Sequence, residues 1–312
     1  MNHPTPSYSG VVPPVVTPLH EDGSVDRASL ERVVEHLLGG GVHGLFALGS
    51  SGETVYLTDE QRDEVLDVVV KTTAGQVPVI AGCIEPATQR VIQRVRAAES
   101  LGVDAVVTTA PFYTLVGPHE VERHFRAIHA ATALPQLAYD IPVCVHVKLG
   151  VDLLVTLARD GVVVGVKDSS GDDVSFRQLV SEVSQDPALA TFSALTGHEV
   201  VVDAMMLAGA SGSVPGLANV DPAGYVRLHD ACVSGDWATA RVEQERITRL
   251  FRIVGAADPA TTFGSTRGVG SFKTALALLG VIDSNAVSLP MRPLDQDETA
   301  RVHDQLELAG LV

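Results

Sequence analysis

The 312-residue chain has few cysteines and no long apolar run. Cys83, Cys144 and Cys232 are too scattered for a CxxC pair or a disulfide framework, so we expect reduced thiols. No segment reaches the ~18 uninterrupted apolar residues of a membrane span. The start, MNHPTPSYSG, has neither the basic nor the apolar region of a signal peptide. These absences predict a cytoplasmic protein with no membrane contact.

Positive charge is also scarce. The net charge is −16 at pH 7, and the chain has no basic stripe that could replace the counterions of a nucleic acid. An anionic substrate would need a local positive pocket, such as a helix N-terminus or a single cation. The lysines are few enough to name: Lys71, Lys148, Lys167 and Lys273.

Metal and nucleotide motifs are missing as well. The 11 histidines are scattered without HExxH. GLFALGSS has the spacing of a phosphate-binding loop, but Ser50 stands where its lysine must be, and GVGSFK near Gly268 lacks a third glycine. The sequence therefore predicts neither a catalytic metal nor a nucleotide cofactor.

Apolar, strand-like runs recur between segments of helical periodicity. They begin at Val11, Gly44, Val77, Asp104, Pro135, Val162, Phe192 and Gly212. One helix is expected from Ser24, and another after the capping box Thr58–Gln61. Alternation of this kind predicts an α/β fold, a (β/α)8 TIM barrel. A doubly wound sheet is the alternative, but TPLHEDG follows the first strand instead of a glycine fingerprint.

From about Pro222 the pattern becomes purely helical. We therefore expect a catalytic barrel over residues 1–222 and a C-terminal helical extension over residues 223–312, packed on the barrel.

Chemistry in such a barrel lies at the carboxyl ends of the strands. These ends carry Ser50, Ser51, Tyr113, Tyr139, Lys167 and the segment Gly197–His198–Glu199. An apolar barrel mouth disfavours a charged lysine, and a neutral amine attacks carbonyls to form an imine with a 2-oxo acid. A phenol near a hydroxyl could relay the protons.

The residues alone leave other interpretations open. Lys167 could form an ion pair with Asp168, and Tyr139 and Tyr113 could be packing aromatics at the rim. Ser50 and Ser51 could serve only as turn and cap residues.

Three motifs reduce this ambiguity: LGSSGE (Leu48–Glu53), YDIP (Tyr139–Pro142) and GVKDSSGD (Gly165–Asp172). They resemble motifs of the dihydrodipicolinate synthase / N-acetylneuraminate lyase family of pyruvate-dependent class I aldolases. Tyr139 and Lys167 lie 28 residues apart, as the tyrosine and lysine of that family do. The resemblance covers nearly the whole chain.

The resemblance implies roles for individual residues. Lys167 would be the Schiff-base lysine, Tyr139 the proton shuttle and Ser50 the relay hydroxyl. Ser51 would hold the pyruvate carboxylate, and Tyr113 would serve the relay of a neighbouring subunit. The implied assembly is a homotetramer, a dimer of dimers. No cofactor is expected beyond the covalent imine.

The predicted substrate-binding set contains residues from five strand ends: Ser51, Gly49, Val214, Ser169, Gly197, His198, Glu199 and Cys144. Val214 would contact the pyruvyl group through its backbone.

The chain departs from the synthase pattern at Cys144, where an arginine would grip the carboxylate of the second substrate. A thiol cannot make that bidentate pair, and the loss would cost about 1.5–3 kcal/mol. Lys148 or His146 could substitute for that arginine, but both lie further along the chain. This departure counts against a role in lysine biosynthesis.

HVKLG is closer to the sialic-acid lyase branch, but half of its sugar-reading set is missing. His198 and Glu199 are present, whereas Val200 and Gly216 replace an acid and a hydroxyl. We therefore predict a lyase that makes or breaks a C–C bond next to pyruvate, with a hydroxylated aldehyde or sugar-acid partner. The alternatives are dihydrodipicolinate synthase proper, with aspartate semialdehyde, a dehydratase or hydratase-aldolase, and a non-catalytic oxo-acid sensor.

Overall fold

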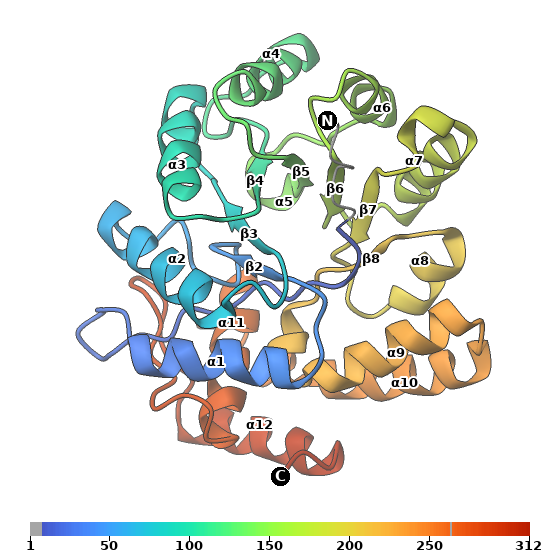
Figure 1. Ribbon diagram of the computed structural model, residues 1–312. Helices are drawn as coiled ribbons and strands as arrows, with labels where there is room; N and C mark the ends of the chain where they lie inside the picture. Colours follow the sequence, from blue (N-terminus) through green and yellow to red (C-terminus); the bar gives the residue numbers. More distant parts are fainter. Residues whose placement is uncertain (1–7, 263) are drawn as a thin grey trace.

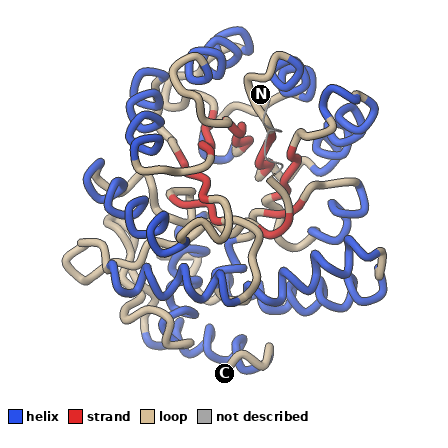
Figure 2. The backbone as a smooth tube through the Cα atoms, viewed as in Figure 1, coloured by secondary structure: helices blue, strands red, loops and turns tan. Residues whose placement is uncertain are grey.

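The computed structural model describes residues 8–262 and 264–312. Eight parallel strands form one curled sheet in the order β1-β8-β7-β6-β5-β4-β3-β2, which occupies the centre of the molecule (Figures 1 and 2). The strands are β1 Gly10–Val11, β2 Leu45–Ala47, β3 Val79–Gly82, β4 Ala105–Thr109, β5 Gln136–Asp140, β6 Gly165–Asp168, β7 Ser193–Thr196 and β8 Gly212–Ser213.

The two ends of this sheet meet and close the barrel. Pro14 forms a parallel bridge with Phe46, and the amide of Val15 donates to the Phe46 carbonyl at 2.9 Å. Seven of the eight apolar runs contain one strand each, and the first begins at Val11, the second residue of β1, so the predicted (β/α)8 barrel is confirmed. The strands are buried on both faces, as expected of a parallel sheet covered by helices.

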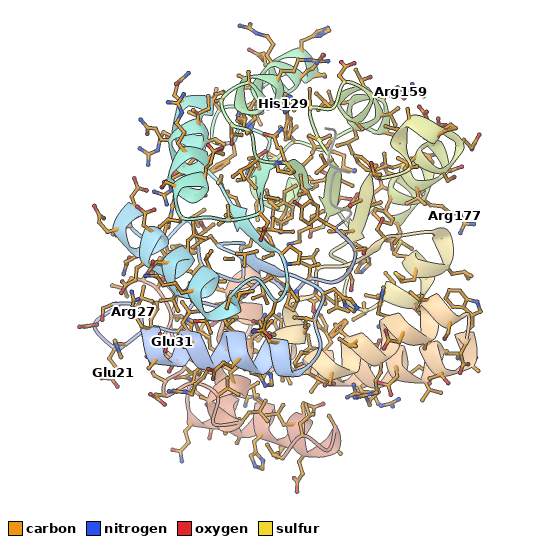
Figure 3. All side chains as sticks on the ribbon, in the orientation of Figure 1. Glu21, Arg27, Glu31, His129, Arg159 and Arg177 are labelled. Carbon is orange, nitrogen blue, oxygen red and sulfur yellow. The ribbon has the colours of Figure 1, made fainter. Side chains whose placement is uncertain are left out.

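Helices surround the strands (Figure 2). They are α1 Arg27–Gly39, α2 Asp59–Thr73, α3 Thr88–Ser100, α4 Pro118–His129, the short α5 Pro142–Val145, α6 Val151–Arg159, α7 Asp173–Gln185, η1 Pro187–Leu189 and α8 Val202–Ala208. The predicted capping box at Thr58 and Gln61 is present. The first helix starts later than predicted, because Asp26 caps it by accepting from the Ser29 amide. Arg159 and Arg177 lie on the outside of this ring (Figure 3).

Further helices follow the last strand: η2 Gly216–Asn219, α9 Pro222–Ser234, α10 Trp237–Leu250, η3 Phe251–Gly255, α11 Ser265–Leu278 and α12 Gln296–Leu308. They lie along one side of the barrel (Figure 1). Leu276 and Leu306 belong to the same apolar cluster as Leu45 of β2. The division of the chain at residue 222 stays a prediction. In the part of the chain described, no helix is long and apolar enough to cross a membrane.

Candidate active site

Three side chains at the carboxyl ends of adjacent strands form one row. Thr109 of β4 is in register with Tyr139 of β5, and Tyr139 is in register with Lys167 of β6. Partners in register on neighbouring strands project to the same side of a sheet. Lys167 is only 5% exposed and Tyr139 only 2%. The amine and the phenol that were predicted at strand ends therefore lie together inside the barrel mouth.

The Lys167 amine is held by aromatic groups. Its Nζ donates to the Tyr139 hydroxyl at 2.9 Å. It also lies 4.1 Å from the centre of the Tyr139 ring and 5.0 Å from that of Phe46. Ring faces attract a cation, so this contact stabilises the amine without a carboxylate partner. Gly49 permits the arrangement, because a Cβ there would lie 2.7 Å from the Phe46 ring.

Asp168, the other candidate partner of Lys167, is engaged elsewhere. Its Oδ1 accepts from the amide and hydroxyl of Ser170 at 2.8 and 2.7 Å, and its Oδ2 lies 3.7 Å from Lys148. Lys148 itself is paired with Asp140, whose carboxyl pKa is raised by burial. Asp140 and Asp168 therefore belong to a separate ion-pair network around Lys148.

A cavity of about 310 Å³ opens beside the row. Its lining residues are Ser50, Thr54, Val55, Tyr56, Ile84, Thr109, Phe112, Tyr139, Ile141, Cys144, Val145, Thr266, Val269 and Met291. The cavity contains the predicted Ser50, Tyr139 and Cys144 together. The hydroxyls of Thr54 and Thr109 are buried and have no hydrogen-bond partner among the described residues. Neither threonine was predicted from the sequence, although Thr109 ends its strand beside Tyr139.

A second cavity of about 220 Å³ shares Ser50 and Val269 with the first. Ser51 and Glu199 line it. The Glu199 carboxylate accepts from the Leu217 amide at 2.7 Å and from the Tyr225 hydroxyl at 3.3 Å. Burial raises the pKa of Glu199 to about 7, against the opposing effects of these hydrogen bonds and of the Lys167 charge. Glu199 is thus near the amine but partly engaged by the backbone.

Four other predicted residues lie outside the lining of the two cavities. A Cβ on Gly197 would lie 2.1 Å from the Ser169 Oγ, so a side chain there would require Ser169 to move. The Val214 amide donates to the Thr196 carbonyl at 2.8 Å, and the Val214 side chain is buried. The His198 imidazole lies 3.2 Å from both carboxylate oxygens of Asp173. None of these four predicted residues lines either cavity.

Tyr113 does not join the site within one chain. It is 95% exposed, and its φ of 74° is a left-handed backbone conformation that is unusual for a tyrosine. The structure therefore leaves the phenol in solvent beside the mouth, where the resemblance implies that it serves another subunit.

The loop that carries Ser50 and Ser51 is anchored by a buried ion pair between Glu53 and Lys273 of α11. Both side chains are fully buried. The Glu53 Oε2 accepts from the Ser288 amide at 2.7 Å, and the Lys273 Nζ donates to the Ala286 carbonyl at 2.7 Å. The C-terminal helices are therefore tied directly to the loop at the active site.

Known proteins share this architecture along the whole chain. The family model described as the dihydrodipicolinate synthetase family matches residues 7–309. A 4-hydroxy-tetrahydrodipicolinate synthase of Phenylobacterium zucineum is 36% identical, covering 98% of this chain and 99% of that protein. An uncharacterized DapA-like lyase of Halobacterium salinarum is 35% identical, covering 97% of this chain and 94% of that protein.

Solved structures agree. The dihydrodipicolinate synthase of Bacteroides thetaiotaomicron superposes with a TM-score of 0.90 at 31% identity, covering 99% of this chain and 100% of that one. YagE of E. coli K12, a family member solved in complex with pyruvate, gives a TM-score of 0.91 at 26% identity, covering 98% and 99%.

The fold and these relatives define a lyase of the class I, pyruvate-dependent aldolase type. The chain belongs to the dihydrodipicolinate synthetase family.

Proposed function

We propose that the protein joins pyruvate to an aldehyde, or cleaves the product, through an imine at Lys167. The observation that carries this proposal is the buried amine of Lys167, 2.9 Å from the Tyr139 hydroxyl at the mouth of the barrel. The pyruvate complex of YagE supports the choice of 2-oxo acid. No cofactor is needed, because the imine itself is the electron sink.

The proposed reaction starts with attack of the Lys167 Nζ on C2 of pyruvate, and water leaves as the imine forms. Loss of a proton from C3 gives an enamine, whose C3 bonds to the carbonyl carbon of the aldehyde. The new alkoxide takes up a proton, and water then hydrolyses the imine to release a 4-hydroxy-2-oxo acid and free Lys167. Tyr139 touches the amine and is the group positioned to move these protons.

Ser50 and Ser51 are proposed to hold the substrate. Ser50 lines both cavities and Ser51 lines the second, so both residues border space that a substrate can occupy. Their hydrogen bonds would orient the pyruvate carboxylate and keep C2 in reach of Lys167.

Tyr113 is proposed to act across an interface between two copies of the chain, in a tetramer built as a dimer of dimers. Its full exposure beside the mouth supports this role, as does the exposure of Leu115 in the same loop. A phenol supplied by a neighbour would complete a relay with Ser50 and Tyr139. The proposed location of the protein is the cytoplasm.

A second candidate is dihydrodipicolinate synthase proper, favoured by the names of the relatives. It requires L-aspartate 4-semialdehyde as the partner, and Cys144 weighs against it because a thiol offers no charge to a carboxylate. The hydroxylated-aldehyde and dehydratase alternatives use the same imine and differ only after it has formed. A sensor would bind pyruvate without exchanging its protons.

The test is the exchange of the pyruvate methyl protons in D₂O, followed by proton NMR without any aldehyde. Exchange requires both the imine and the enamine, so the wild type should lose the methyl signal far faster than Lys167→Ala. Equal rates for the two proteins would refute the imine mechanism. Exchange by the wild type alone would also exclude the sensor.

A further inference from the structure

We propose that the aldehyde partner carries an uncharged, apolar substituent, such as a short branched alkyl or a phenyl group. This inference rests on the proposed function and names the substrate class of the same site. It follows from the walls of the cavity beside Tyr139, the hydrogen-bond partner of Lys167, and from the positions of the nearby charged groups.

The first observation is the chemistry of the lining. Seven of its side chains are apolar: Val55, Ile84, Phe112, Ile141, Val145, Val269 and Met291. The remaining side chains are hydroxyls and the Cys144 thiol, and no described residue of the lining carries a formal charge. The thiol of Cys144 is neutral at pH 7 because the ordinary pKa of cysteine is about 8.5. Although the residue is exposed, partial desolvation raises this pKa further, and the Lys167 charge opposes that effect.

The basic residues that follow Cys144 in the chain are not placed to bind a substrate anion. The Lys148 Nζ is paired with the buried Asp140 and also donates to the Leu149 carbonyl at 3.2 Å. His146 is exposed and does not line the cavity. A carboxylate on the aldehyde would therefore lose its water without meeting a charged side chain in the described lining, which is unfavourable.

A polyhydroxylated chain would find no acidic partner in this cavity, because no described residue of its lining carries a carboxylate. Thr109 and Tyr139 are in register at the strand ends, and the Tyr139 hydroxyl accepts from the Lys167 amine, where the pyruvyl group and the new hydroxyl must be placed. Glu199, the acid that would contact a polyol, lines only the second cavity, and one of its oxygens accepts from Leu217 and Tyr225. The other hydroxyls share the lining with seven apolar side chains, so a substituent meets apolar groups and single hydroxyls instead of carboxylates.

The cavity volume limits the size of the substituent. About 310 Å³ is at the lower end of the ~300–1,000 Å³ of ordinary ligand cavities. Because the pyruvyl group occupies part of it, a compact substituent fits better than a long chain.

The experiment measures pyruvate consumption with four aldehydes as probes: isobutyraldehyde, benzaldehyde, succinic semialdehyde and glyceraldehyde. The wild type should use the two apolar aldehydes with kcat/KM about tenfold or more above the other two, since each unpaired polar group is costly to bury. Equal or higher kcat/KM for succinic semialdehyde or glyceraldehyde would overturn the inference.

Aldehydes differ in intrinsic reactivity, so the kcat/KM ratio of two aldehydes is compared between a variant and the wild type. Cys144→Arg places a cation in the lining and should shift the kcat/KM ratio of succinic semialdehyde to isobutyraldehyde about tenfold or more toward the anion. Val242→Arg adds the same charge at an exposed site on α10, away from the cavity, and should leave the ratio unchanged. A Cys144→Arg ratio equal to that of the wild type would also overturn the inference.

Proton exchange with pyruvate alone separates this inference from the proposed function. If the wild type exchanges the methyl protons but prefers a polar aldehyde, or uses none of the four, only the substrate class is wrong. If it does not exchange them, the imine mechanism itself is wrong.

Discussion

Replacing Lys273 with methionine should destabilise the fold by about 3–5 kcal/mol, because it removes one partner of a fully buried ion pair. Glu53 would keep its hydrogen bond from the Ser288 amide but lose its cation. Glu53 also sits at a φ of 60°, two residues after Ser51, so its carboxylate helps to hold a strained loop.

The estimate depends on how strongly the Lys273 charge relies on Glu53. Burial lowers the pKa of Lys273, and the Glu53 charge opposes that shift, so the charged amine depends on its partner. Removing both charges in Glu53→Gln/Lys273→Met should therefore cost less than the sum of the two single changes. A buried pair replaced as a whole is often close to neutral in stability.

Urea unfolding of the wild type, both single variants and the double variant measures these free energies. Lys71→Met is the matched control, because Lys71 is exposed on α2 and its pair with Asp67 should be worth about 1 kcal/mol or less. If Lys273→Met lowers the free energy of unfolding no more than Lys71→Met does, Lys273 does not stabilise the fold through a buried ion pair. If the effects of the two single changes simply add in the double variant, Glu53 and Lys273 are not coupled.

Three further predictions concern single side chains. Tyr139→Phe should slow the exchange of the pyruvate methyl protons by about 10²–10⁴-fold, measured by NMR, because the hydroxyl that contacts the Lys167 amine is lost. An unchanged rate would contradict the role of Tyr139 as the proton shuttle. Tyr113→Phe should lower turnover with an aldehyde in steady-state assays, whereas unchanged turnover removes it from the relay. Burial lowers the pKa of His124 to about 4, so the unfolded chain binds more protons between pH 6.5 and 4. When the pH is lowered from 6.5 to 4, the free energy of unfolding of the wild type should fall on the order of 3 kcal/mol more than that of His124→Gln. Urea titrations at both pH values measure this difference, and equal losses in the two proteins would contradict the prediction.

The barrel was predictable because each strand is a short apolar run bounded by turn formers, and because parallel strands end on one face. That rule alone brought Tyr139, Lys167 and Ser50 toward one mouth. It also covers Thr109, which was missed because a threonine at a strand end carries no chemical signal of its own. Its register with Tyr139 makes it part of the site.

Other features depend on contacts that no local pattern encodes. Glu53 and Lys273 meet only because α11 packs back against the mouth. Likewise, the sequence shows Glu199 as an acid in a loop, but not that the Leu217 amide and Tyr225 occupy one of its oxygens. The α1 start was misplaced because Ser24 and Asp26 are both good cap residues, and only the Asp26 side chain accepts from the Ser29 amide.

Imine formation between Lys167 and pyruvate can be trapped with sodium borohydride. Intact mass and peptide mapping after incubation with pyruvate and borohydride should show a single carboxyethyl adduct on the peptide that contains Lys167, and no adduct on Lys167→Ala. A correctly folded wild type that gains no mass, or an adduct at Lys148 or another amine, would contradict imine formation at Lys167.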